Sequence, residues 1–399
     1  MDSGSGYQIL MLSRRRFDPA VASGTPYFML QALRRYLGDV DVLDGLAPWN
    51  RLSAGLSAGP DRILPVAAIT ARRVFWRLLA KQYDWQRSRS LSAYCARVIA
   101  EHLRNRSYDF LFVDKGTAEI AFLETEIPIV YSHDSVACDL IDYSAYFSRL
   151  PRSCIPVAQF LEERAVAKAA VCIYSSNWAA RSALRNLRLP TDKVKVINNG
   201  PNFDGDPLEA GDVRVPRKPG KVCRLLLVGG DWERKGVDVA IEAARQLNGR
   251  GVATTLTVCG CMPPGRAKAP DFVTVIPFLD KRDPAAARRF RTLFADATFF
   301  ILPTRAECCA QVLIEAMAFG LPALCTDIGG NSDVVGDGVC GCLLRPGASG
   351  ADYAERARQC LAVPGLYETF SSSARRAYES RLNWSFWASE VDRTVQGVL

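Results

Sequence analysis

The most constraining feature of the chain is a short apolar run that is followed by a turn and then a helical pattern, repeated along its whole length. These runs cover residues 7–13, 109–114, 127–133, 170–176 and 194–198, and then 223–229, 253–260, 272–278, 297–304 and 322–327. Runs this short, rich in β-branched and aliphatic residues, are typical of buried parallel strands, and the helical stretches between them complete βαβ units. The sequence therefore predicts an α/β protein with parallel sheets.

A polar segment divides this alternation into two halves. Residues 199–221 are dense in glycine, proline and charge, as interdomain linkers are. We expect two Rossmann-like, doubly wound domains facing a cleft, at residues 1–200 and 222–375, joined by a linker at 201–221. A chain of 399 residues with 49% hydrophobic content is large enough for two cores. The segment 376–399 is predicted to be a helix that packs back across the domain junction onto the N-terminal domain.

Composition argues against several classes of protein. No stretch approaches the roughly 18 to 20 apolar residues that span a bilayer, and the opening residues lack a basic region followed by an apolar one, so we expect a soluble cytoplasmic chain. The 13 cysteines include no CxxC pair and the chain has only two histidines, which argues against a zinc site and favours reduced thiols.

The basic excess lies in the first half of the chain. Residues 1–200 carry 26 basic and 19 acidic side chains, a bias that favours anionic partners. The basic residues are most concentrated in segment 70–90. We interpret this segment as a helix that covers the sheet and has a solvated basic edge. The alternative is a segment that makes a weak peripheral contact with the inner face of the membrane. No nucleic-acid-binding module is recognised. The side chains concerned are Arg72, Arg73, Val74, Phe75, Arg77, Leu78, Leu79 and Lys81.

The strongest chemical signal is PTRAECCAQVLIEAMAFGLP, in which Glu307 and Glu315 are separated by a loop and the start of a helix. A helix N-terminus and loop amides suit a diphosphate, while carboxylates accept hydrogen bonds from hydroxyls. On spacing alone, a solvated helix face is the favoured explanation of the two glutamates. The loop amides belong to Cys308, Cys309, Ala310 and Gln311.

The second signal is VGGDWERKGVD, a glycine-rich turn between a strand and a helix. Gly229 and Gly230 allow a ligand to approach the backbone closely, and Lys235 or Arg234 is suited to neutralise a phosphate. The segment has neither the Walker A nor the GxGxxG pattern. Taken alone, its basic residues are also explained as ordinary surface residues.

Together, these two segments and TDIGGNSDVVGDGVCGCLL resemble the family-4 type retaining glycosyltransferases of the GT-B fold, with their E-x7-E motif. Weaker pieces, SGTPYF, YSHD and YSSNWAARSAL, extend the resemblance to the N-terminal half. The resemblance implies that Glu315 holds the ribose hydroxyls, that Glu307 lies beside the transferred sugar, and that Lys235 binds the diphosphate. The amides of Cys309, Ala310 and Gln311 would lie near the sugar hydroxyls and phosphates.

The chain departs from the family pattern at two places. The family usually has an arginine directly after the VG, where this chain has Gly230, and Arg234 is the candidate replacement. Cys309 stands where a glycine is common.

Two N-terminal positions also belong to the predicted site. His133 resembles a family histidine that reaches toward the donor sugar, with Asp134 orienting it; the alternative is a hydrogen-bonded histidine without a catalytic role. Gly24 and Thr25 follow the first strand, with Thr25 expected as the helix N-cap and Pro26 as its first residue. The family has a glycine-rich loop here, close to donor phosphate and acceptor; an ordinary βα turn is the alternative.

The function implied is a retaining hexosyltransferase that uses a nucleoside diphosphate sugar, UDP-sugars being favoured over GDP-sugars. The resemblance implies front-face transfer without a metal or another cofactor, to an unidentified acceptor that is a small molecule, a glycan or a lipid-linked saccharide. The alternatives are an isomerase like the sugar-nucleotide 2-epimerases and a non-catalytic nucleotide-sugar binding protein. The DxD triplets Asp39/Asp41 and Asp204/Asp206 occur at chance frequency and are not interpreted as metal sites.

Overall fold

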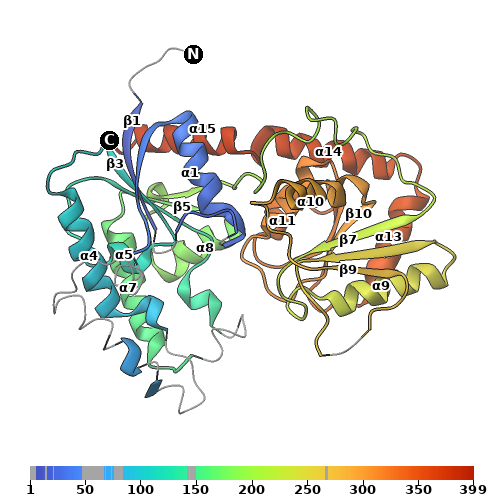
Figure 1. The fold of residues 1–399 in the computed structure, drawn as a ribbon, viewed down its shortest axis with the longest axis horizontal. Coiled ribbons are helices and arrows are strands. Elements are labelled where there is room, and N and C mark those ends of the chain that lie inside the picture. Colours follow the sequence, from blue (N-terminus) through green and yellow to red (C-terminus); the bar gives the residue numbers. More distant parts are fainter. Residues whose placement is uncertain are drawn as a thin grey trace. The chain divides into compact units, whose positions relative to one another are not determined.

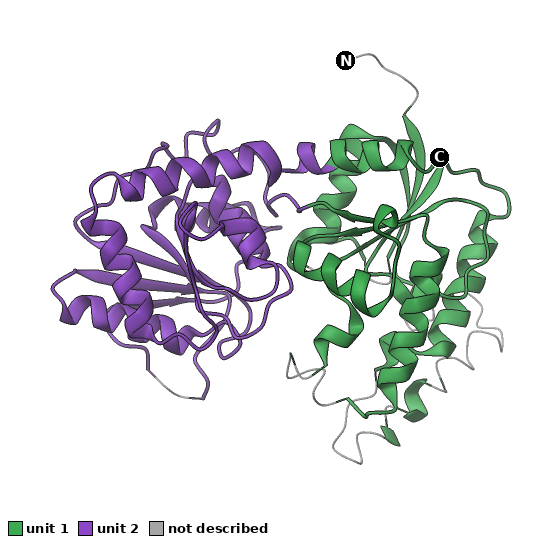
Figure 2. Ribbon diagram, turned by 180° about the vertical axis from the view of Figure 1, so that it is seen from behind, with its two compact units in different colours: residues 1–197, 388–399 green, residues 198–387 purple. Residues whose placement is uncertain are grey.

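The chain folds into two compact units, which Figure 2 shows in separate colours. Unit 1 comprises Met1–Ile197 together with Ala388–Leu399, and unit 2 comprises Asn198–Trp387. The segment 201–221, predicted as a linker, is thus assigned to unit 2. The computed structural model describes residues 6–13, 16–20, 22–46, 67, 69–72, 74–75, 84–141, 143, 150–265 and 268–399.

The described part of unit 1 contains a six-stranded parallel sheet in the order β2-β1-β3-β4-β5-β6. Helices connect successive strands, as Figure 1 shows. The strands are β1 (Tyr7–Leu12), β2 (Gly38–Leu43), β3 (Phe110–Asp114), β4 (Ile129–His133), β5 (Val171–Tyr174) and β6 (Val194–Val196). The helices are α1 (Thr25–Tyr36), α4 (Arg89–Leu103), α5 (Thr117–Ile120), α7 (Cys154–Lys168) and α8 (Asn177–Asn186), with short 3-10 turns at Ala22–Gly24, Trp85–Arg87, Ala137–Leu140 and Thr191–Lys193.

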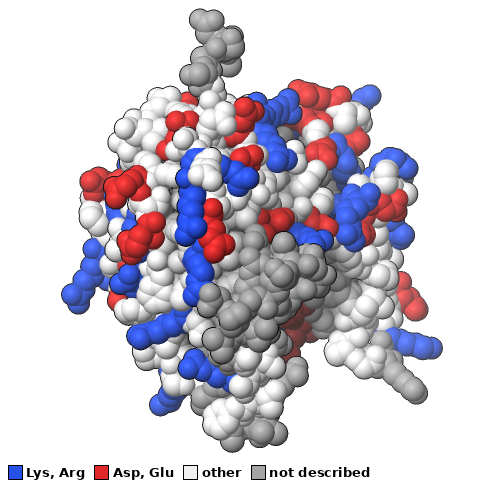
Figure 3. All heavy atoms as spheres, turned by 60° about the vertical axis from the view of Figure 1, so that its left-hand side comes forward, with Lys and Arg blue, Asp and Glu red and all other residues white. Residues whose placement is uncertain are grey.

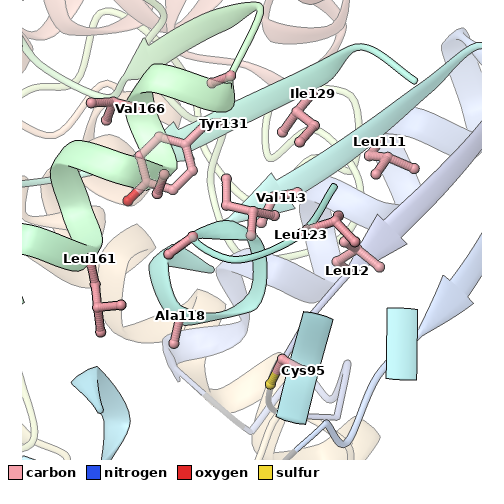
Figure 4. Close-up of a cluster of buried hydrophobic side chains, with 14 of the residues drawn as sticks. Leu12, Cys95, Leu111, Val113, Ala118, Leu123, Ile129, Tyr131, Leu161 and Val166 are labelled. Carbon is pink, nitrogen blue, oxygen red and sulfur yellow. The ribbon is translucent and has the colours of Figure 1, made fainter. Parts of the chain in front are cut away.

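The core of unit 1 lies between the central strands and the helices that cover them. Figure 4 shows part of it, with Leu111 and Val113 of β3 near Ile129 and Tyr131 of β4. Alternate residues along β3 point to the same face, which is why Leu111 and Val113 share this cluster. Leu161 of α7 packs into the same cluster.

The described part of unit 2 contains a second six-stranded parallel sheet, in the order β12-β11-β10-β7-β8-β9. Leu226 and Val228 of β7 pack on one face of this sheet and Leu225 and Leu227 on the other, so both faces are covered. The strands are β7 (Cys223–Val228), β8 (Thr254–Cys259), β9 (Val273–Ile276), β10 (Phe299–Leu302), β11 (Ala323–Thr326) and β12 (Gly341–Leu344). The helices are α9 (Val237–Gly249), α10 (Pro284–Asp296), α11 (Gln311–Ala318), α12 (Asn331–Val335), α13 (Gly350–Ala362), α14 (Leu366–Arg381) and α15 (Trp384–Gln396).

These sheets confirm the predicted pair of parallel, doubly wound α/β domains. Asp39 and Asp41 lie on β2, where Asp39 accepts a hydrogen bond from the Gln8 side chain at 3.2 Å and Asp41 accepts one from the Tyr108 hydroxyl at 2.8 Å. Both aspartates thus support the edge of the sheet.

The C-terminal segment 376–399 is not one helix, because α14 ends at Arg381 and α15 begins at Trp384. The Asn383 side-chain oxygen accepts a hydrogen bond from the Phe386 amide at 2.9 Å, which starts the new helix. From Ala388 onward, α15 belongs to unit 1, where the Tyr7 hydroxyl donates to Asp392 at 2.9 Å.

The basic segment 70–90 is described only in part. Val74 and Phe75 are 54% and 56% exposed, whereas Arg73, Arg77, Leu78, Leu79 and Lys81 lie outside the described residues. On the face shown in Figure 3, acidic side chains lie among the basic ones. Within the described residues, no helix combines the length and the apolar character that crossing a bilayer requires.

Candidate functional site

A buried ion cluster lies beyond the carboxyl ends of β7 and β10, which are neighbours in the unit 2 sheet. Lys235 Nζ contacts Oε1 of Glu307, and the Arg234 guanidinium donates to the same oxygen at 2.6 Å. The side chains of Glu307 and Lys235 are each 9% exposed, whereas that of Arg234 is 36% exposed. The two basic residues of one predicted motif thus converge on the first glutamate of the other.

The electrostatics of this cluster favour an anionic ligand. Burial alone would raise the pKa of Glu307, but Lys235 and Arg234 outweigh it and hold that pKa below its ordinary value. Glu307 is therefore ionised at neutral pH. Two cations sharing one carboxylate leave a surplus positive charge among these three side chains, which a phosphate group would neutralise.

Hydrogen bonds between two loops fix Arg234 and Lys235 in this position. The carbonyl of Arg234 accepts from the Thr304 hydroxyl at 3.0 Å and from the Arg305 amide at 2.7 Å. These contacts join the turn after β7 to the loop after β10. The Lys235 amide donates to the Asp231 carbonyl at 3.1 Å, so the chain holds both cations by their backbone as well as by their ion pairs.

Gly329 allows a third loop to pack against Glu307. Its φ is +59°, and a Cβ at this position would lie 1.9 Å from the Glu307 carbonyl oxygen. The next amide, that of Gly330, donates to the Cys308 carbonyl at 2.7 Å. A residue with a side chain would be strained here and would collide with the backbone that carries Glu307.

The two glycines after β7 have different surroundings. A Cβ on Gly229 would lie 2.7 Å from Cγ of Lys235, so the lysine stem occupies the space above this glycine. A Cβ on Gly230 would meet nothing within 4 Å. Gly229 is therefore needed for the placement of Lys235, while the position of the family arginine at Gly230 is open.

Glu315 lies on α11, which starts directly after the Glu307 loop. The helix is preceded by the partly exposed Cys308 and Cys309 and by the buried Ala310, and the Gln311 side-chain amide donates to the Gly200 carbonyl. Glu315 itself is only 2% exposed. Because Glu307 and Glu315 are both buried, the interpretation of a solvated helix face is wrong.

Sequence reasoning missed Lys281, which is the ion-pair partner of Glu315. Lys281 lies in the loop between β9 and α10, and its Nζ is 2.9 Å from Oε1 of Glu315. Burial raises the pKa of Glu315, while Lys281 acts most strongly in the opposite direction and Lys235 also lowers it. Lys281 does not belong to any motif recognised in the sequence, because its loop approaches α11 only in the folded protein.

In unit 1, His133 ends β4 and is 7% exposed. Its Nδ1 accepts hydrogen bonds from the amides of Asp134 and Ser135 at 3.1 and 3.2 Å. This network assigns the ring proton to Nε2, which makes that nitrogen a hydrogen-bond donor. Asp134 is bound by Lys115, whose Nζ is 2.6 Å away; burial opposes ionisation of Asp134, but Lys115 lowers its pKa.

The prediction that Thr25 caps α1 is wrong by one residue. The helix begins at Thr25, and Gly24 is its N-cap, with φ of +90° and no side-chain cap. This left-handed conformation suits glycine, and a Cβ there would lie 2.9 Å from the Pro19 carbonyl oxygen. Gly24 and Thr25 therefore form the turn between β1 and α1, as expected for a βα junction.

The second DxD triplet also has a structural partner. Asp206 pairs with Arg375 of α14 at 2.7 Å. Within the described ranges, no group of three or more histidine, cysteine, aspartate or glutamate side chains is arranged to hold a metal ion.

The fold brings the predicted residues of unit 2 into two adjoining groups and those of unit 1 to the carboxyl ends of its strands. Arg234, Lys235 and Glu307 form the first group in unit 2, beside Gly229. Glu315 and Lys281 form the second, and the effect of Lys235 on Glu315 links the two groups.

Comparisons with known proteins agree with this architecture. Residues 223–362 match the family model described as glycosyl transferases group 1. The alpha-D-kanosaminyltransferase of Streptomyces kanamyceticus is 26% identical over 249 residues, which cover 59% of this chain and 63% of that protein. The match therefore spans less than two thirds of that relative's length.

Solved structures of glycosyltransferases share the fold over nearly the whole chain. Sucrose-phosphate synthase from Thermosynechococcus elongatus superposes with a TM-score of 0.66 at 15% identity and covers 98% of each chain. HepE from Anabaena, solved in complex with UDP and glucose, has a TM-score of 0.61 at 17% identity and covers 98% of this chain and 100% of its own. These likenesses confirm the expectation of the GT-B fold.

Proposed function

We propose that the protein is a retaining glycosyltransferase that moves a sugar from a nucleoside diphosphate sugar to an acceptor. The observation that carries this proposal is the cluster in which Lys235 and Arg234 share the buried carboxylate of Glu307. The match of residues 223–362 to glycosyl transferases group 1 supports the same reaction class.

The donor is bound by unit 2 in this proposal. Lys235 and Arg234 neutralise the diphosphate, with the amides of Cys309, Ala310 and Gln311 at the N-terminal end of α11 as further donors. Glu315 accepts hydrogen bonds from the ribose hydroxyls, and Glu307 lies beside the sugar. UDP is the favoured nucleotide, which the presence of UDP in the HepE structure supports.

Transfer proceeds on the front face of the sugar, as in the family that the sequence resembles. The bond between the anomeric carbon and the diphosphate oxygen breaks, and the charge that develops on the diphosphate is stabilised by Lys235, Arg234 and the helix amides. The acceptor hydroxyl then attacks from the side of the departing diphosphate, which takes up the hydroxyl proton, so the anomeric configuration is retained. His133 contributes its Nε2–H as a hydrogen-bond donor to the sugar or its phosphate.

A thermal-shift screen of UDP-, GDP-, ADP- and TDP-sugars tests the donor proposal. The best donor is then incubated with small-molecule, glycan and lipid-linked acceptors, while release of the nucleoside diphosphate and the configuration of the product are measured. We expect stabilisation by one donor class, which Glu315→Gln reduces, and turnover that depends on an acceptor.

Three results would overturn the proposal. If no nucleotide sugar stabilised the protein, the proposed donor site would be contradicted. A new nucleotide sugar formed from the donor alone would favour the isomerase, and donor binding without turnover over the whole acceptor panel would favour a binding protein.

A further inference from the structure

We propose that Lys281 is a positioning residue of the nucleotide site. It holds the buried carboxylate of Glu315 by one oxygen and leaves the other to accept a hydrogen bond from a hydroxyl of the nucleoside. This inference rests on the proposed function, because it assigns a partner to the glutamate that binds the ribose.

Three contacts from different elements fix the Lys281 ammonium. Its Nζ lies 2.9 Å from Oε1 of Glu315 on α11 and 2.9 Å from the carbonyl oxygen of Asn202, which precedes β7. It also lies 4.0 Å from the centroid of the Phe290 ring on α10, a favourable cation–π distance. The side chain is 17% exposed, so the ammonium is held within the protein and not on a mobile surface stem.

The two oxygens of Glu315 are in unequal positions. Oε1 is paired with Lys281, whereas Oε2 is buried and has no hydrogen-bond partner. A buried acceptor without a partner is unfavourable, because it has lost its hydrogen bonds to water. A hydroxyl donor from a ligand would satisfy Oε2, and the contact with Lys281 would keep the carboxylate in the orientation that receives it.

Charged and titratable groups around Glu315 determine how Lys281 acts. Burial raises the pKa of Glu315, and Lys281, the backbone of Asn202 and Lys235 lower it. The Cys259 thiol, at the end of β8, interacts electrostatically with both Lys281 and Glu315, and also with Arg289 of α10. Lys281 is thus the strongest of the groups that keep Glu315 ionised.

Removal of Lys281 should make nucleotide binding depend more strongly on pH. A carboxyl whose pKa is raised in the folded protein is ionised above that pKa and becomes protonated as the pH falls through it. In a variant without Lys281, protonation of Glu315 occurs at higher pH. Below the pKa of Glu315 in that variant, its affinity for the nucleotide should fall by up to about tenfold per pH unit. The wild-type protein should show a smaller decrease over the same range.

Calorimetric titration of the full-length protein from about pH 6 to about pH 8 tests this, because an unperturbed carboxyl does not titrate there. The probe is whichever of UDP, GDP and ADP the wild-type protein binds most tightly, together with its 2′-deoxy analogue. We expect Lys281→Met to weaken binding about 30-fold or more near pH 7, as loss of one partner of a buried charge pair does, and further at lower pH. Lys281→Arg should restore most of the affinity.

Matched variants separate positioning from other effects. Arg282→Met removes the neighbouring cation, which pairs with the exposed Asp280, and should leave affinity unchanged. In a Glu315→Gln background, Lys281→Met should cause no further loss, and its effect should be smaller with the 2′-deoxy probe. Lys281→Gln, which keeps a donor for the Asn202 carbonyl, replaces Lys281→Met if that variant does not fold.

The results distinguish failure of this inference from failure of the proposed function. If the wild-type protein binds none of the three diphosphates, the proposed function fails and the inference with it. If the wild type binds but Lys281→Met has the same affinity at every pH, only the inference fails. Additive losses from Lys281→Met and Glu315→Gln would also overturn it, because they would indicate that Lys281 contacts the nucleotide directly.

Discussion

Glu307 and Glu315 are both buried, yet their environments shift their pKa values in opposite directions. Burial raises both, but Glu307 has two cations on one oxygen and its pKa is lowered, whereas Glu315 is paired with Lys281 and its pKa is raised. Environments that separate the pKa values of two similar groups often mark different roles. Here they agree with the proposed roles, a permanent anion beside the cations proposed to bind phosphate, and a proposed hydroxyl acceptor on α11.

Lys235→Ala should lower turnover about 10²-fold, because one preorganised charge partner of the departing diphosphate is lost. Steady-state kinetics with the best nucleotide sugar measure this. Lys221→Ala is a suitable control, since Lys221 is exposed on the stretch before β7 and should leave turnover unchanged. Near-normal turnover of Lys235→Ala would remove this lysine from the mechanism.

Glu307→Gln should destabilise the protein in a pH-dependent way. It leaves the buried Lys235 ammonium without its carboxylate, which costs about 3 kcal/mol at neutral pH. The folded-state pKa of Glu307 is lowered, so its stabilising effect is present above the unfolded pKa of about 4.3 and is lost as the pH falls through the folded value.

Urea unfolding of both proteins at several pH values measures this effect. The difference in unfolding free energy should be constant near neutral pH and should shrink below about pH 4. A difference that stays the same at every pH would contradict the assignment of Glu307 as a paired anion.

Sequence patterns at the residue scale identified Lys235, Arg234, Glu307 and Glu315 because each stands in a local motif. They could not indicate Lys281, which reaches Glu315 from a loop 34 residues earlier in the chain. A lysine in a charged loop such as LDKRDP has no local feature that separates it from a surface residue. Its contact depends on the register of β9 and α10 against α11, which is a tertiary property.

At the scale of elements, the strands that sequence analysis missed are both at sheet edges. β2 and β12 are the terminal strands in their sheets. β2, with the sequence GDVDVL, alternates aspartate with valine, and β12 is a four-residue strand in a glycine-rich stretch. Central strands are buried on both faces and have continuous apolar sequences, whereas edge strands need not be apolar throughout. Burial is therefore incomplete in β2, whereas β12 is largely buried but short, and its glycine-rich surroundings conceal it in the sequence.

Gly329→Ala should disrupt the Glu307 loop. The substitution imposes a left-handed conformation on alanine, at a cost of about 1 kcal/mol, and places Cβ 1.9 Å from the Glu307 carbonyl oxygen. We expect a large loss of nucleotide-sugar affinity, measured by calorimetry. Gly347→Ala is the matched control, since Gly347 also has positive φ, of +77°, but a Cβ there meets nothing within 4 Å. Equal losses in the two variants would indicate backbone strain alone and not displacement of Glu307.

At the scale of the whole molecule, the residues proposed to bind the donor nucleotide all lie in unit 2. Unit 2 is built around its own two hydrophobic clusters, one on each face of its sheet. Near its C-terminal end, Trp384 contacts the beginning of the unit, because its ring nitrogen donates to the Pro201 carbonyl at 2.7 Å. The Trp384 ring also packs against Trp387. The later part of α15, with the buried Val391 and Val395, belongs to unit 1.

A fragment of residues 198–387 should therefore fold and bind the nucleoside diphosphate on its own. It keeps Lys235, Glu307, Glu315 and Lys281, and it ends before the apolar side chains that α15 buries in unit 1. We expect its affinity, measured by calorimetry, to lie within about tenfold of that of the full chain, a difference of about 1.4 kcal/mol. Transfer activity should be absent, because His133 and the turn at Gly24 belong to unit 1.

The same fragment carrying Glu315→Gln gives the control, since it should fold equally well and bind the nucleotide more weakly. A folded fragment that binds no diphosphate while the full chain does would indicate that unit 1 supplies part of the nucleotide site. We would then infer that unit 1 contacts the nucleotide of the donor and not only its sugar. Binding by the fragment would instead confine recognition of the nucleotide to unit 2, so that the basic excess of residues 1–200 has to serve the sugar, the acceptor or another surface.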